Sequence, residues 1–62
     1  MLKIILCDDD PFILKIIQEQ IEGILSSQGL DGRIVCISSN GKDMISYLKN
    51  HPGEYLFFLD LD

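Results

Sequence analysis

A chain of 62 residues can form one small domain, and a hydrophobic content of 47% is too high for a disordered tail. The net charge of -5, from 10 acidic residues and 5 Lys or Arg, leaves no basic patch for nucleic acid. No apolar run approaches the roughly 20 residues of a membrane span, and acids follow the apolar start where a signal peptide would have small residues. We therefore expect a cytoplasmic protein whose own residues bind neither membrane nor nucleic acid.

The first half of the chain has the pattern of a strand, a helix and a second strand. Residues 2–7, LKIILC, form an almost continuous apolar run, which is typical of a strand covered on both faces. Asp10 and Pro11 have the chemistry of a helix start, and apolar residues with helical spacing follow them, so we predict a helix over 11–28. The β-branched run RIVCI predicts a second, shorter strand over 33–37.

The second half adds a helix and a third strand. The turn residues SSNG precede a predicted helix over 41–50, in which Met44, Ile45 and Leu48 share one face. NHPG ends this helix because proline cannot continue it. The run YLFFLDL predicts a strand over 55–61. The alternation of strands and helices predicts a parallel sheet with helical crossovers.

The burial expected of each strand indicates the order of the sheet. The first and third strands are apolar on both faces, whereas the second is shorter and flanked by Arg33 and serines. Doubly buried strands belong inside a sheet, so we expect the first strand in the centre and the order 2-1-3. Since crossovers are right-handed, this order places one helix on each face. The predicted fold is α/β, with the strand order in which flavodoxin-like sheets begin.

Five of the ten acidic residues follow or end two of the predicted strands. They are Asp8, Asp9, Asp10, Asp60 and Asp62. The carboxyl ends of parallel strands meet at one edge of the sheet, so we expect Asp8, Asp9 and Asp60 to lie together, with Asp10 as the helix cap. Clustered carboxylates suit Mg²⁺, and an ionised carboxylate beside Mg²⁺ can attack a phosphoryl group. The sequence thus predicts a Mg²⁺-dependent acyl-phosphate site, to which Asp62 adds its carboxylate or its backbone carbonyl.

The stretches KIILCDDDP, SSNGKDMISYL and YLFFLDLD, with the helix from Pro11, resemble the N-terminal half of a response-regulator receiver domain. The resemblance covers the whole chain, and CDDDP and FFLDLD are similar to the receivers of LytTR-type regulators. It implies that Asp60 accepts a phosphoryl group from a sensor histidine kinase. It also implies that Asp9 binds Mg²⁺ directly, Asp8 assists through water or a further contact, and Asp62 contributes its backbone carbonyl. Such a module is a phosphoacceptor signalling domain and not an enzyme.

A receiver domain is about twice as long as this chain. The later strands of a receiver carry one Ser or Thr and one Lys at the phosphorylation site. None of the Ser or Lys residues of this chain lies at a matching position. The resemblance therefore implies a truncated receiver, without its second half or any output domain, that cannot complete the phosphorylation switch. DNA binding would come only from such an output domain. The apolar third strand would be an exposed sheet edge, through which we expect the chain to associate with itself.

Two alternatives remain open. FFLDLD also fits the DxD motif of haloacid-dehalogenase-type phosphatases, with Asp60 as the nucleophile and Asp62 as the general acid. In that family the motif follows the first strand, and CDDDP has no equivalent. The other alternative is a pseudo-receiver, an interaction module whose acidic residues bind no metal.

Overall fold

The computed structural model describes residues 1–60. Its elements are β1 (Leu2–Asp8), α1 (Pro11–Ser27), β2 (Gly32–Ser38), α2 (Gly41–Asn50) and β3 (Leu56–Asp60). Their order is the one predicted from the sequence. The first strand is one residue longer than predicted and includes Asp8, which we had expected to follow it. Leu61, the last residue of the predicted third strand, lies outside the described residues.

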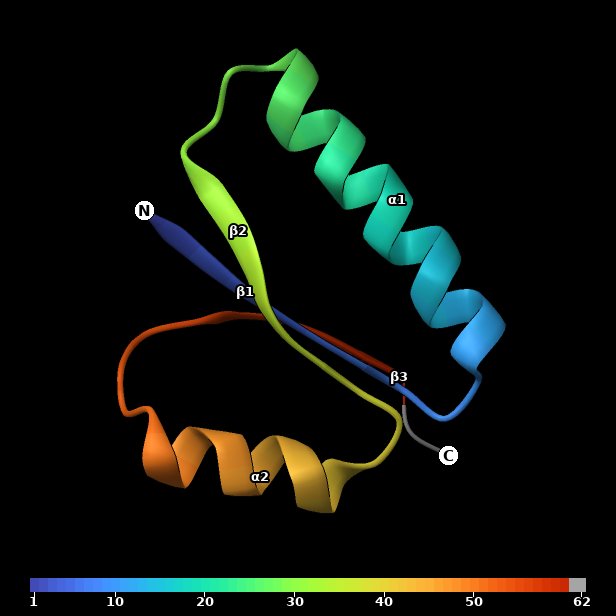
Figure 1. Ribbon diagram of the computed structural model, residues 1–62, viewed down its shortest axis with the longest axis vertical. Helices are drawn as coiled ribbons and strands as arrows, with labels where there is room; N and C mark the ends of the chain where they lie inside the picture. The colour runs from blue at the N-terminus through green and yellow to red at the C-terminus, as the bar shows by residue number, and fades with distance from the viewer. Residues whose placement is uncertain (61–62) are drawn as a thin grey trace.

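The three strands form one parallel sheet with the order β2-β1-β3. The helices α1 and α2 lie on opposite sides of this sheet (Figure 1). The predicted α/β fold, with the first strand in the centre and one helix on each face, is confirmed. Neither of the two helices in the described residues is long and apolar enough to cross a bilayer.

The core is built on the central strand. Ile4, Ile5, Leu6 and Cys7 of β1 are each at most 2% exposed. Ile4 and Leu6 pack against Leu14 and Ile21 of α1, with Ile17, Leu25 and Ile34 around them. Helix α2 has no buried residue. The α1 side of the sheet therefore contributes most of the core.

Side chains at the helix starts satisfy amide groups that have no partner within the helix. The carboxylate of Asp10 accepts a hydrogen bond from the Phe12 amide at 2.9 Å, so the predicted cap of the first helix is confirmed. Asn40 accepts one from the Asp43 amide at 2.8 Å, and its own amide group donates to the Asp43 carboxylate at 3.1 Å. Gly29, after α1, has a φ of 63°, which lies in the left-handed region that favours glycine.

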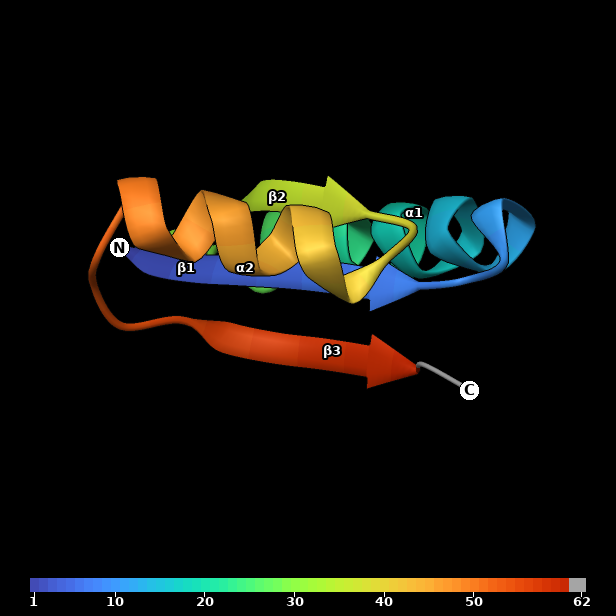
Figure 2. The ribbon, with the colours of Figure 1, turned by 90° about the horizontal axis from the view of Figure 1, so that it is seen from below.

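Strand β3 is the exposed edge of the sheet. Both helices pack over β1 and β2, and neither packs on β3. Figure 2 shows β3 beside β1 and away from both helices. Leu56, Phe57, Phe58 and Leu59 consequently remain 41–53% exposed. The two-sided apolar run indicates a strand that needs cover on both faces, and the described residues do not provide it.

We expect the core on the α1 side to determine stability. Ile4→Ala should lower the free energy of unfolding by about 2–5 kcal/mol, because it removes buried methyl groups and leaves a cavity. At about 0.05–0.15 kcal/mol per residue, a domain of this size has only about 3–9 kcal/mol in total. Ile16→Ala is the matched control, because it makes the same change at a residue of α1 that is 51% exposed. Urea unfolding followed by circular dichroism would measure both, and equal losses would contradict the assignment of the core.

Candidate functional site

Asp8 and Asp60 lie side by side at the carboxyl end of the sheet. Each is the last residue of its strand, and the two are direct partners in the parallel register of β1 and β3. Neighbouring strands are about 4.8 Å apart, so both carboxylates occupy the same edge. Figures 1 and 2 both show the two strand ends together. The juxtaposition of these two acids, expected from the strand order, is therefore present.

Asp8 is more deeply buried than the sequence suggested. It is 2% exposed, and one carboxylate oxygen, Oδ1, accepts a hydrogen bond from the Asp10 amide at 2.8 Å. The other oxygen, Oδ2, is buried and has no hydrogen-bond partner among residues 1–60. A buried carboxylate is costly unless its charge is compensated. Asp8 thus presents a buried oxygen that a cation can satisfy.

Asp60 is exposed and shares a small pocket with Asp8. The pocket has a volume of about 140 Å³. It is lined by Leu6, Cys7, Asp8, Leu14, Ile17, Phe58, Leu59 and Asp60. Its walls are mainly apolar side chains, so electrostatic interactions within it are screened less than in open water. The exposed acid is accessible to a reactant, while its buried neighbour is held in place by the core.

The remaining predicted site residues have different surroundings. Asp9 is exposed in the short link between β1 and α1. Asp10 caps the helix through its side chain, and its backbone amide holds Asp8. Asp62, predicted to offer its backbone carbonyl, lies outside the described residues. The structure therefore brings Asp8 and Asp60 together and gives Asp10 a supporting role.

The donor set at this edge determines which cation it suits. Within residues 1–60, no three His, Cys, Asp or Glu side chains form a group that could hold a metal ion. Zinc sites require such a group, whereas Mg²⁺ keeps several waters and needs only one or two carboxylates. The orphaned Oδ2 of Asp8 beside the Asp60 carboxylate matches this smaller requirement. The residues present fit Mg²⁺ better than a metal that needs a complete protein cage.

The two cysteines are free thiols. Cys7 is buried in β1 and lines the small pocket that Asp8 and Asp60 share. Burial raises the pKa of the Cys36 thiol, and the nearby Cys7 and Asp43 raise it further. Cys36 therefore stays protonated near neutral pH and is a weak nucleophile.

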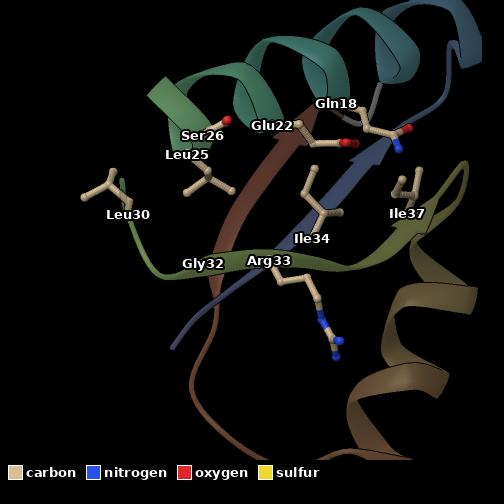
Figure 3. A pocket seen from close by; sticks show the side chains of 9 residues that line it. All are labelled: Gln18, Glu22, Leu25, Ser26, Leu30, Gly32, Arg33, Ile34 and Ile37. Atoms are coloured by element: carbon tan, nitrogen blue, oxygen red, sulfur yellow. The ribbon is translucent and has the colours of Figure 1, made fainter. Parts of the chain in front are cut away.

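A larger hollow of about 430 Å³ lies between α1 and β2, away from the acidic edge (Figure 3). Its charged lining residues are Glu22 and Arg33, and Figure 3 shows the Arg33 side chain pointing away from the others. The remaining lining is a mixture of amide, hydroxyl and aliphatic groups. The groups that suggest a chemical function thus lie at the smaller pocket.

Comparison of the chain with protein-family models, with curated proteins and with solved structures found no match. The candidate site is therefore defined by its own geometry.

Asp10 should contribute to stability and not to metal binding. Asp10→Ala should lower the free energy of unfolding by about 1 kcal/mol, because the Phe12 amide loses its acceptor. The backbone amide that holds Asp8 is unchanged by the substitution. Asp10→Asn is the control, since asparagine is an equally good cap. Chemical denaturation and a Mg²⁺ titration of each variant would test this, and a loss of Mg²⁺ affinity in both variants would identify Asp10 as a ligand instead.

Proposed function

We propose that this chain is the phosphoacceptor part of a two-component receiver, in which Asp60 accepts a phosphoryl group from a histidine kinase. One observation carries the proposal: an exposed Asp60 lies next to a buried Asp8 that has an unsatisfied oxygen. An acceptor carboxylate must be accessible to the phosphoryl donor, whereas a cation-binding carboxylate benefits from a fixed position. The two residues meet these different requirements. The proposal places the chain in the cytoplasm, and any DNA binding in a separate output domain.

The proposed reaction is a single phosphoryl transfer. An oxygen of Asp60 attacks phosphorus in line with the P–N bond of a phosphohistidine. The P–O bond of an aspartyl phosphate forms as the P–N bond breaks, and the departing imidazole nitrogen takes up a proton. Bound Mg²⁺ would neutralise charge on the transferred group. In this proposal Asp8, fixed through the Asp10 amide, would supply one oxygen to the cation, and Asp60 supplies the nucleophile.

Two further acids would complete the cation site in this proposal. Asp9 directly follows Asp8 and supplies a second carboxylate, and Asp62 supplies its main-chain carbonyl. Lys3 lies at the amino end of the sheet, with its ammonium 5.5 Å from the centre of the Tyr55 ring, so it does not neutralise the acids. The proposal accordingly concerns phosphoryl acceptance and not the conformational switch.

The phosphatase alternative uses Asp60 and Asp62 in one strand-end motif and assigns no role to Asp8. The buried carboxylate beside Asp60 supports the receiver, because the strand-end motif of the phosphatase alternative leaves Asp8 unused. The pseudo-receiver alternative differs in a measurable way, because it predicts no response to Mg²⁺.

Mg²⁺ should stabilise the chain through Asp8. At ten times its dissociation constant, the ion should raise the free energy of unfolding by about 1.4 kcal/mol, because it binds the folded state. Asp8→Asn should abolish this increase, since asparagine keeps an oxygen for the Asp10 amide but lacks the charge. Asp31→Asn, at an 86% exposed position, should leave it intact. Thermal unfolding with and without Mg²⁺ is the measurement, and an equal Mg²⁺ effect in Asp8→Asn would exclude this site.

Asp60 should be the residue that is phosphorylated. With phosphoramidate and Mg²⁺, we expect the chain to gain one hydroxylamine-sensitive phosphoryl group by intact-mass spectrometry, and Asp60→Asn to gain none. Asp62→Asn should still be phosphorylated, because the receiver uses only the backbone at that position. Loss of phosphorylation in Asp62→Asn but not in Asp60→Asn would contradict the assigned acceptor.

A further inference from the structure

The loop that joins β2 to α2 contains an asparagine followed directly by a glycine, Asn40 and Gly41. In such a pair the backbone nitrogen of glycine can attack the side-chain amide of asparagine, because glycine has no Cβ to shield that nitrogen. Asn40 is exposed, and Gly41 is the first residue of α2. An amide at this position has no acceptor within its helix, so the hydrogen bonds of α2 do not hold the attacking nitrogen.

The folded chain keeps Asn40 in a conformation that cannot react. Its side-chain oxygen accepts a hydrogen bond from the Asp43 amide at 2.8 Å, and its side-chain nitrogen donates to the Asp43 carboxylate at 3.1 Å. Its backbone is extended, with a ψ of 154°. Ring closure requires the Cβ of Asn40 and the nitrogen of Gly41 to be eclipsed about the Cα–C bond, and the extended backbone keeps them apart. The helix cap must therefore open before the reaction can start.

The start of α2 is the part of this region that can open. On the strand side, the hydroxyl of Ser38 donates to the Asn40 carbonyl oxygen at 2.6 Å and accepts from the Asn40 amide at 3.2 Å. Ser38 is only 6% exposed, so this end of the loop is anchored in the sheet. Helix α2 has no buried residue, and elements with few buried contacts open locally at low cost.

We propose that Asn40 is a site of spontaneous deamidation and that the α2 cap, through Asp43, sets the rate of the reaction. The Gly41 nitrogen, after losing its proton to water, forms a bond to Cγ of Asn40, and the side-chain nitrogen leaves as ammonia. Water then opens the succinimide ring. Attack of water at the side-chain carbonyl gives aspartate, and attack at the backbone carbonyl gives isoaspartate. The reaction is independent of the function proposed for Asp60.

Both products change the carboxyl edge of the sheet. Ser38, the last residue of β2, pairs with Cys7, so the loop leaves the sheet at the same edge as Asp8. Either product adds a carboxylate to this edge and removes the donor to the Asp43 carboxylate. Aspartate is still a good helix cap, whereas isoaspartate lengthens the backbone by one carbon and loses the cap geometry. The isoaspartate product should therefore weaken the start of α2.

Incubation of the folded 62-residue chain in mildly alkaline buffer, followed by peptide mapping and an isoaspartyl methyltransferase assay, tests the site. We expect isoaspartate at Asn40 and none at Asn50 over the same period, because the side chain of His51 shields the nitrogen that follows Asn50. In urea that unfolds the chain, the rate at Asn40 should rise about fivefold or more, the change in population that corresponds to the loss of one helix cap. No isoaspartate at Asn40, modification of Asn50 at the same rate, or equal Asn40 rates in the folded and unfolded chains would overturn the proposal.

Asp43→Ala tests the role of the cap without unfolding the chain, which circular dichroism would verify. It removes the carboxylate that holds the Asn40 side-chain nitrogen, so the folded-state rate should rise about twofold to tenfold while the rate in urea stays the same. Asp31→Ala, the same change in charge at an 86% exposed position, is the matched control and should alter neither rate. Gly41→Ala should slow the reaction in both states, because its methyl group shields the attacking nitrogen. An unchanged folded-state rate in Asp43→Ala would exclude control by the cap, and an unchanged rate in Gly41→Ala would exclude the Gly41 nitrogen as the nucleophile.

Discussion

The parallel register between β1 and β3 is the constraint on which the candidate site depends. It places Asp8 opposite Asp60, and the alternation of side chains along a strand places both on the α1 side with Leu6 and Phe58. A slip of one residue would set Asp60 opposite Cys7 and turn the two carboxylates toward different faces. The same register sets Leu56 beside Ile4 and Phe58 beside Leu6, so both strands present apolar residues to the α1 side. The core and the acidic pair are thus products of the same alignment.

The burial of Asp8 lowers the stability of a small domain. A chain of this length buries a limited core, yet it places a carboxylate at the end of its most buried strand. One oxygen of that carboxylate is satisfied by the Asp10 amide, and the other has no partner within residues 1–60. Local choices that conflict with stability in this way are characteristic of functional positions. The unsatisfied oxygen is therefore stronger evidence for a cation site than the number of acidic residues.

The elements and their order could be predicted from the spacing of apolar residues in the sequence. The burial of individual acidic side chains could not. Apolar runs and helical spacing gave the five elements, and the contrast between the two-sided strands and RIVCI gave the strand order. Asp10 was predicted as a cap from its place before Pro11, and its hydrogen bond to the Phe12 amide confirms this. The three consecutive acids carry no signal for which one is buried. In the structure, Asp8 ends the buried strand β1 and lines a pocket with Leu14 and Ile17 of α1, whereas Asp9 lies in the exposed link that follows.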